Sequence, residues 1–261
     1  MEISLIGKQA LIGGSSKGIG LAIAKQLAIS GASVCLMARN KSKMKEIVKN
    51  LPSDKKQRHH FLQVDFSDFN SFKEKIDAFF VENKIDILVN NTQGPPSGNS
   101  LSKSIQDYQS SFDLLFKNIV YTTSLALSNM KIQGWGRIIN IASVSVREPL
   151  NYLVLSNTIR AAVVTWGKSL SLDVALDGIT VNSILTGYFD TERIAKLNAE
   201  KAKNLNISEN QILSLMKKMI PVNRLGKPEE YGYLVAFLAS NKAAYINGIS
   251  IPIDGGLLKS L

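Results

Sequence analysis

The chain has 261 residues, of which 45% are apolar, 18 are glycine and 7 are proline. This composition excludes a disordered or collagen-like chain, and the length suits one large α/β domain. No apolar run approaches the roughly 18 residues that a membrane span needs. The first residues lack the basic and then apolar pattern of a secretory signal. We therefore expect a cytoplasmic protein that does not enter a membrane.

Positive charge is in excess, because 31 Lys and Arg stand against 21 Asp and Glu for a formal net charge of +10. A basic surface can attract nucleic acid, an acidic membrane or an acidic protein. The cations are spread along the chain in short clusters, without the basic stripe or zinc-finger spacing of a nucleic-acid-binding module. An ordinary basic surface is the simpler interpretation, and we expect no nucleic-acid partner.

Few side chains could bind a metal. The chain has one cysteine, Cys35, and two histidines, His59 and His60. A single cysteine cannot form an internal disulfide, which suits a reducing compartment. So few histidines make a His-rich metal site and a Ser-His-Asp triad hard to build, and we expect no metal.

Predicted strands alternate with predicted helices along the whole chain. The apolar runs predict strands at 9–13, 33–38, 61–65, 85–90, 137–143, 180–184 and 250–253. The 3.6-residue periodicity predicts helices near 18–30, 42–50, 68–82, 105–132, 152–173 and 228–239. Strands that are apolar at consecutive positions are typical of a sheet covered on both faces. The pattern favours an α/β fold, with a doubly wound parallel sheet of about seven strands and helices on both faces. We expect a single domain over 1–261.

Residues 191–219 depart from this alternation. They are polar and helix-prone, and charged residues interrupt a thin apolar pattern. The segment follows the sixth expected strand, where a helical insertion on the substrate side would leave the sheet undisturbed. A solvated insertion and a functional lid are both open interpretations.

A glycine-rich turn joins the first expected strand to the first expected helix, with the sequence GGSSKGIG at 13–20. Glycines permit a tight turn and a close approach of the backbone to a pyrophosphate, and the helix N-terminus adds free N–H groups. The strand before and the helix after favour a phosphate-binding loop over a plain turn. The predicted cofactor-binding residues here are Gly14, Ser15, Ser16, Lys17, Gly18, Ile19 and Gly20.

The end of the second expected strand indicates which dinucleotide would bind. A site for NAD(H) would place a carboxylate there for the ribose 2′-hydroxyl. This chain has no acid at that point, and Arg39 stands there, with Lys17 in the glycine loop. Two cations suit a 2′-phosphate, so NADP(H) is favoured over NAD(H). Two solvent-facing cations without a ligand are the alternative.

Motifs along nearly the full length carry a family resemblance. They are GGSSKGIG at 13–20, Asp65 after the third strand, VNN at 89–91, GRIINIAS at 136–143, GITVN at 178–182, RLGKPEE at 224–230 and IDGG at 253–256. With them the chain resembles the short-chain dehydrogenase/reductase family, in particular its 3-oxoacyl-[acyl-carrier-protein] reductase-like members. The resemblance implies a Rossmann-type fold, a small carbonyl or alcohol substrate, and a homo-oligomer, either a tetramer or a dimer.

The resemblance also implies further cofactor contacts. Asp65 and Phe66 would contact the adenine, and Asn91 would flank the cofactor ribose. Gly187 and Thr191 would lie beside the nicotinamide carboxamide. The residue pattern agrees, since Asp65 and Asn91 lie at the carboxyl ends of expected strands, where open α/β sheets bind ligands.

The catalytic positions depart from the family. Its members use a serine that binds the carbonyl, a tyrosine about thirteen residues later as general acid, and a lysine four residues further. Ser143 matches the serine, whereas Ser156 replaces the tyrosine and Arg160 replaces the lysine. The family's helical asparagine falls on Leu115, with Asn118 one turn later on the same face.

These replacements bear on proton transfer. An aliphatic hydroxyl such as that of Ser156 is far too weak an acid to replace a tyrosine. Arg160 could hold the nicotinamide ribose, but a guanidinium with a pKa above about 12 is a poor proton donor. Tyr152, one turn before Ser156, is the nearest phenol in sequence; a packing role is its simpler interpretation.

Three hypotheses follow. The first is an NADP(H)-dependent oxidoreductase in which Ser143 polarises the substrate oxygen, Arg160 places the cofactor, and the proton comes from water or substrate. The second is an NADP(H)-binding sensor or non-catalytic subunit that has lost the acid. The third is a surface for an acyl carrier or nucleic acid built on the +10 charge. Turnover, binding without turnover, and a steep salt dependence of partner binding would distinguish them.

Overall fold

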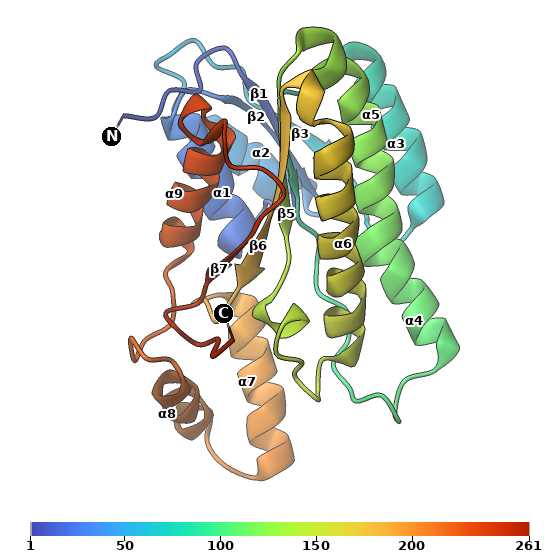
Figure 1. The fold of residues 1–261 in the computed structure, drawn as a ribbon. Helices are drawn as coiled ribbons and strands as arrows, with labels where there is room; N and C mark the ends of the chain where they lie inside the picture. The colour runs from blue at the N-terminus through green and yellow to red at the C-terminus, as the bar shows by residue number, and fades with distance from the viewer. Residues whose placement is uncertain (1, 261) are drawn as a thin grey trace.

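Seven parallel strands form the centre of the molecule (Figure 1). The computed structural model describes residues 2–260, so the ends of the expected 1–261 domain, Met1 and Leu261, lie outside the described residues. The strand order is β3-β2-β1-β4-β5-β6-β7, which confirms the doubly wound parallel sheet. The strands are β1 (Gln9–Gly13), β2 (Ser33–Ala38), β3 (His60–Gln63), β4 (Ile87–Asn90), β5 (Gly136–Ile141), β6 (Ile179–Thr186) and β7 (Ser250–Ile253).

Helices cover both faces of this sheet, with α1, α2 and α9 on one side and α3, α5 and α6 on the other (Figure 1). Among residues 2–260, no helix combines the length and apolar character that crossing a membrane requires. The α-helices are α1 (Gly18–Ile29), α2 (Lys41–Asn50), α3 (Phe69–Glu82), α4 (Ile105–Phe112), α5 (Asn118–Gln133), α6 (Val154–Asp173), α7 (Glu192–Leu205), α8 (Glu209–Met219) and α9 (Pro228–Ala239).

The two helical layers explain why the strands are apolar throughout. Successive side chains of a strand point to opposite faces. In β1, Ile12 packs into the core under α1 and α9, while its neighbour Leu11 packs into the core under α3 and α5. A sheet buried on both faces therefore needs the continuous apolar runs seen in the sequence.

Several expected boundaries were wrong. The third strand was expected at 61–65 but is His60–Gln63, so Asp65 lies in the loop that follows. The fifth strand was expected at 137–143 but ends at Ile141, which places Ser143 two residues beyond it. Both shifts move a predicted site residue from a strand into the loop at its carboxyl end.

The expected helix at 105–132 is helical throughout but contains an irregular turn. A π-helical turn, η1 (Asp113–Lys117), separates α4 from α5. The side chain of Asn118 donates a 3.2 Å hydrogen bond from Nδ2 to the carbonyl of Leu114, four residues earlier. In a π-helical turn the backbone N–H groups bond five residues back instead of four. Here the side-chain amide of Asn118 supplies a donor to the carbonyl four residues back. Apolar periodicity does not reveal such a change, because the face is apolar on both sides of it.

The segment at 191–219 forms α7 and α8, which lie beyond the carboxyl ends of the strands (Figure 1). The strand order reverses between β1 and β4, since β2 and β3 continue to one side and β5 to the other. Loops that diverge at such a point leave a crevice that ligands of open α/β sheets occupy. The fold thus directs attention to the loops after β1, β4, β5 and β6.

Candidate active site

The glycine loop is a tight left-handed turn between β1 and α1. Gly14 and Gly18 have φ angles of 57° and 54°, a region that favours glycine. A Cβ on Gly20 would lie only 2.3 Å from the carbonyl oxygen of Gly14, so the turn closes on the helix without room for a side chain. No side chain caps the N-terminus of α1. Its N–H groups and the positive end of its dipole are thus available to an anion.

Ser15 has its hydroxyl engaged within this loop. Its Oγ donates to the carbonyl of Ile12 at 2.8 Å and accepts the N–H of Met37 at 3.0 Å. The side chain is fully buried. Ser15 therefore connects the end of β1 to the end of β2 and fixes the shape of the loop. Ser16 and Ile19, by contrast, are partly exposed.

The first turn of α7 closes against the glycine loop. Lys17 Nζ and Glu192 Oε2 are 2.5 Å apart, and both side chains are exposed. The ion pair lowers the pKa of Glu192. The methyl group of Thr191 lies 3.4 Å from the position of a Cβ on Gly18. The structure thus brings Thr191 to the glycine loop, and it places Lys17 against a carboxylate that the sequence did not indicate.

The end of β4 is packed directly against the end of β1. Asn91 Nδ2 donates to the carbonyl of Gly13 at 3.0 Å. A Cβ on Gly13 would lie 2.1 Å from the carbonyl oxygen of Asn91, so only glycine fits there. The predicted residue Asn91 is therefore held at the switch point between the two halves of the sheet.

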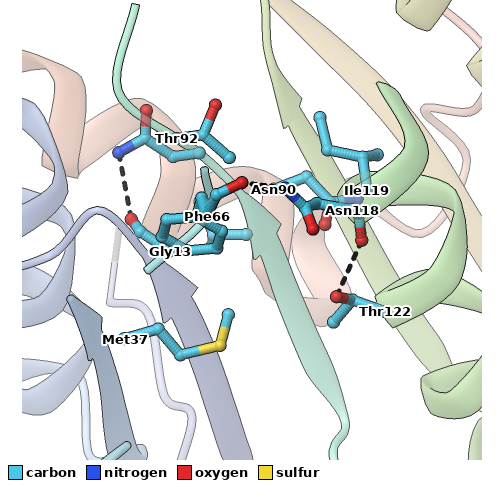
Figure 2. A pocket seen from close by; sticks show the side chains of 10 residues that line it. Gly13, Met37, Phe66, Asn90, Thr92, Asn118, Ile119 and Thr122 are labelled. Carbon is cyan, nitrogen blue, oxygen red and sulfur yellow. Dashed lines mark hydrogen bonds between the residues drawn. The ribbon is translucent and has the colours of Figure 1, made fainter. Parts of the chain in front are cut away.

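A recess opens beside this contact and is bordered by Phe66, Met37, Asn118 and Thr122 (Figure 2). Asn118 Nδ2 donates to the carbonyl of Phe66 at 2.7 Å, and the buried Oδ1 has no protein partner. Leu115 is buried in the core beneath α5. Leu115 thus has no polar group to offer at the position of the family's helical asparagine, whereas Asn118 keeps a buried amide oxygen without a protein partner.

Arg39 and Asp65 follow neighbouring strands, β2 and β3, at the same edge of the sheet. Arg39 is exposed. Asp65 accepts the N–H of Ser67 at 2.9 Å and its hydroxyl at 2.6 Å. These hydrogen bonds, aided by the charge of Arg39, lower the pKa of Asp65. A carboxylate and a guanidinium thus lie at the same edge of the sheet, and their predicted contacts with adenine and a 2′-phosphate stay predictions.

Ser143 lies just beyond β5, in extended backbone at the start of a short 3₁₀ turn, η2 (Val144–Val146). Its Oγ accepts the N–H of Ser145 at 3.2 Å and the hydroxyl of Ser145 at 2.8 Å. Ser145 is fully buried. With two protons accepted, the hydroxyl proton of Ser143 remains free to bind an oxygen of a ligand.

Ser156 and Arg160 lie one turn apart on α6, on the same helix face. Arg160 is mostly buried, and its Nη1 donates to the carbonyl of Ile141, the last residue of β5. Burial, with a smaller effect from nearby Arg193, lowers the pKa of Arg160 to about 10. The guanidinium is therefore still a cation at neutral pH. It reaches the same strand end that Ser143 follows.

Tyr152, which precedes α6, and Tyr188, which follows β6, are neighbours in the structure. Burial, and then the neighbouring hydroxyl of Tyr152, raise the pKa of Tyr188. Tyr188 follows Gly187, where a Cβ would lie 2.6 Å from Cα of Asp254. The resemblance assigns Gly187 a position beside the nicotinamide, so Tyr188 is a phenol next to that residue in sequence, and its raised pKa keeps it protonated at neutral pH.

The sequence did not indicate Ser145, Tyr188 or Arg193 as site residues. The pattern Ser-Val-Ser at 143–145 could have indicated Ser145, because in a turn a serine can hydrogen bond to the residue two positions before it. Arg193 Nη2 donates to the carbonyl of Pro95 at 2.9 Å, across 98 residues of sequence. No local pattern indicates a contact of that separation.

The arrangement fits a dinucleotide. The glycine cradle, the uncapped N-terminus of α1 and the switch point between β1 and β4 suit a pyrophosphate. A hydroxyl donor at Ser143 and a cation at Arg160 converge on the end of β5. Such a pair can bind and polarise an oxygen atom next to a bound ligand.

The comparisons with known proteins agree with this geometry. Residues 14–258 match the family described as enoyl-(acyl carrier protein) reductase. The 3-oxoacyl-[acyl-carrier-protein] reductase FabG of Aquifex aeolicus is 30% identical over 98% of this chain and 100% of its own length. The oxidoreductase UcpA of Salmonella typhimurium is 34% identical over 97% of this chain and 95% of its own.

A solved structure extends the likeness to the fold. The crystal structure of L-sorbose reductase from Gluconobacter frateurii, complexed with NADPH and L-sorbose, has a TM-score of 0.92 and 30% identity, with 100% of both chains covered. Sequence motifs, strand order and full-length similarity thus agree. The chain belongs to the short-chain dehydrogenase/reductase family.

Proposed function

We propose that the protein is an NADP(H)-dependent oxidoreductase that transfers hydride between the nicotinamide and a carbonyl or alcohol substrate, such as a 3-oxoacyl compound. The observation that carries this proposal is that Ser143, with its free hydroxyl proton, follows the end of β5 at which Arg160 hydrogen bonds to the carbonyl of Ile141. Both lie at the edge of the sheet that also presents the glycine loop. The family relatives named above include reductases, one of them solved with NADPH.

The cofactor would lie along the carboxyl ends of the strands. The glycine loop, residues 14–20, would hold the pyrophosphate, and Asp65 and Phe66 the adenine. Arg39 supports NADP(H) over NAD(H), because a guanidinium binds a 2′-phosphate and no acid competes at the end of β2. Asn91, Gly187 and Thr191 would flank the ribose and nicotinamide. When bound, NADPH supplies the hydride, and NADP⁺ accepts it in the reverse direction.

Ser143 would donate its free proton as a hydrogen bond to the substrate oxygen. The N–H and the hydroxyl of Ser145 both donate to Oγ of Ser143, which leaves the hydroxyl proton of Ser143 available to the substrate. Negative charge develops on the substrate oxygen as the carbonyl is reduced, and a fixed donor at that position lowers the barrier. The cation of Arg160 adds to this stabilisation and would also position the nicotinamide ribose.

The proton itself would come from water or from the substrate. Ser156 is one turn from Arg160, and its hydroxyl can orient a water molecule but is too weak an acid to replace a phenol. We place Ser143, Ser156 and Arg160 in the catalytic group on this basis.

A non-catalytic NADP(H)-binding subunit or sensor is the second candidate. The observation that favours it is the absence of the family's Tyr and Lys at 156 and 160. An enzyme with a complete cofactor site and no proton donor would bind NADPH without turning it over.

The experiment is NADPH oxidation, followed by absorbance, with a panel of ketones, quinones and 3-oxoacyl compounds. The wild type is compared with the triple variant Leu115→Asn/Ser156→Tyr/Arg160→Lys. Turnover by the wild type supports the oxidoreductase. Turnover by the triple variant alone shows that the pocket is intact but the acid is lost, and the binding protein is then the better conclusion.

We further propose a single domain, cytoplasmic location and a homo-oligomer, either a tetramer or a dimer. The oligomer is supported by exposed apolar side chains on α4 and α6, such as Ile105 and Leu172. Exposed apolar surface is a mark of subunit interfaces. Light scattering that gave a monomer mass at micromolar concentration would contradict this.

A further inference from the structure

After β7 the chain continues as a strap, residues 254–260, at the carboxyl ends of the strands (Figure 1). Asp254 shapes the start of this strap. One of its carboxylate oxygens accepts the N–H of Gly256 at 2.9 Å, and the other accepts the N–H of Leu258 at 2.8 Å. The strap is therefore a turn of defined shape.

The strap begins in direct contact with Gly187. The N–H of Gly187 donates to the carbonyl of Ile253 at 3.0 Å. A Cβ on Gly187 would lie 2.6 Å from Cα of Asp254, so backbone meets backbone there without a side chain between them. Because such close packing leaves no space to adjust, Gly187 and the start of the strap hold one another in place.

The middle of the strap packs around Ser143. Leu257 and Leu258 are half-buried against three buried residues, Ala142, Val144 and Leu185. Two of these three residues flank Ser143 in sequence, and the third lies on β6 just before Gly187. The strap thus touches the segments on both sides of the predicted reaction centre.

The far end of the strap is held by one carboxylate. Glu148 Oε1 accepts the backbone N–H of Lys259 at 2.8 Å and that of Ser260 at 2.9 Å. The N–H of Glu148 in turn donates to the carbonyl of Val144 at 3.2 Å. Hydrogen bonds to an ionised acceptor are about twice as strong as those between neutral groups. Glu148 therefore fastens the strap to the turn that carries Ser143.

We propose that Glu148 is a positioning residue for the reaction, which fixes the hydroxyl of Ser143 relative to Gly187 by fastening the strap that joins them. A hydrogen-bond donor aids a transition state only where it is held in the correct geometry, and a shift of about 1 Å can cost a large factor in rate. The inference rests on the proposed function, because that function assigns the substrate oxygen to Ser143 and the nicotinamide to Gly187.

The first test is kinetic and uses NADPH oxidation with a substrate that the wild type reduces. Glu148→Ala should lower kcat roughly tenfold or more and change KM by less than about twofold, as loss of an effect confined to the transition state requires. Glu148→Gln keeps an acceptor oxygen and should recover most of kcat. The matched control is Glu74→Ala, which removes an exposed carboxylate from α3. A wild-type kcat in Glu148→Ala overturns the proposal.

The same substitution in a Ser143→Ala background separates positioning from a general loss of structure. If Glu148 acts through Ser143, adding Glu148→Ala to Ser143→Ala should change kcat by less than about twofold, because residues that act together are not additive. Additive losses would show that Glu148 affects the rate by another route, and they also overturn the proposal.

Hydrogen exchange tests the strap without any turnover. The N–H of Val146 donates to the carbonyl of Ser143, and the N–H of Gly187 donates to the strand that leads into the strap. We expect Glu148→Ala to speed exchange about tenfold in peptides that contain these two amides, since it removes hydrogen bonds to a charged group. Glu74→Ala should leave both peptides unchanged. Faster exchange confined to Lys259 and Ser260 would show that the strap does not hold the turn, against the proposal.

Failure of the proposed function is a separate result. If the wild type oxidises no NADPH with any carbonyl compound but both peptides respond to Glu148→Ala, Glu148 still fixes Ser143 relative to Gly187 and the oxidoreductase is excluded. If the wild type turns over and Glu148→Ala turns over equally well, the oxidoreductase stands and the positioning role does not.

Discussion

The hydroxyl of Ser145 donates to Oγ of Ser143 over 2.8 Å, and the same Oγ accepts the backbone N–H of Ser145. A buried side chain two residues away thus decides the direction in which Ser143 offers its proton. Ser145 is therefore a positioning residue, because, of the two serines, only Ser143 would touch the substrate oxygen.

Replacing Ser145 tests this relationship. We expect Ser145→Ala to lower kcat about fivefold with little change in KM, because a hydrogen bond of roughly 1 kcal/mol orients the donor. The measurement is steady-state NADPH oxidation with a substrate that the wild type reduces. Ser169→Ala, which removes an exposed hydroxyl on α6, is the control. An unchanged kcat in Ser145→Ala would show that Ser143 needs no such partner.

Gly13 is the point of closest contact between the two halves of the sheet. Gly13→Ala places a Cβ 2.1 Å from the carbonyl of Asn91, so β1 and β4 must separate. We expect a loss of about 3 kcal/mol in the free energy of unfolding, together with a loss of NADPH binding. Urea denaturation and fluorescence titration measure the two effects.

Gly134→Ala serves as the comparison for that variant. Gly134 also ends an element and has a φ of 63°, but no atom lies within 4 Å of its Cβ position. Gly134→Ala should lower the free energy of unfolding by about 1 kcal/mol, from backbone strain alone, and leave NADPH binding unchanged. Equal losses in the two variants would mean that the contact with Asn91 adds nothing.

Arg39 sets the predicted preference between the two nicotinamide dinucleotides. Arg39→Asp should weaken NADPH binding roughly ten- to a hundredfold, as expected for the loss of a charge-assisted hydrogen bond to phosphate, and leave NADH binding unchanged or improved. Lys41→Ala, at the start of α2, removes a nearby cation as the control. Equal weakening of both dinucleotides in Arg39→Asp would show that Arg39 does not contact the 2′-phosphate.

Glu230 gives a prediction for acid stability. It accepts two N–H donors of Arg224, at 2.8 Å and 2.6 Å, and the backbone N–H of Lys227 at 2.7 Å. These bonds hold the pKa of Glu230 at about 2, below the ordinary 4.5. Because the folded-state pKa is the lower one, the stabilisation is present above pH 4.5 and is lost as the pH falls from there toward 2.

Glu230→Gln should therefore lower the melting temperature at pH 6 by about 1–2 °C, as an exposed ion pair of roughly 0.5 kcal/mol implies. The difference from the wild type should vanish near pH 2. Glu229→Gln changes an exposed neighbour in the same turn and should have no such pH-dependent effect. A constant difference across this range would exclude ionisation of Glu230 as the cause.

Local patterns predicted the elements that depend on local chemistry. The apolar run before Gly13 and the helix after Gly18 were both correct, because a phosphate-binding turn needs a strand, glycines and a helix in succession. The doubly wound parallel sheet followed from the alternation of elements, whereas the order of its strands comes from the structure. The family resemblance singled out positions 143, 156 and 160, and in the structure Arg160 hydrogen bonds to the strand end that Ser143 follows.

The contacts that cross the molecule were not predictable in this way. Arg193 meets the β4 loop and Glu192 meets Lys17 only because the start of α7 lies against the loops at the carboxyl ends of the strands. The direction of a polar helix is set by packing that its own sequence does not specify. The π-turn before Asn118 was missed for a related reason, since the residues on both sides keep the same apolar face.

Three consecutive residues at the start of α7 contact both halves of the site. Thr191 and Glu192 touch the glycine loop, and Arg193 touches the loop after β4. Because these three residues share one helix turn, a displacement of the glycine loop is transmitted through that turn to the loop after β4. The first turn of α7 is in this sense a mechanical coupling between two loops that belong to different halves of the sheet.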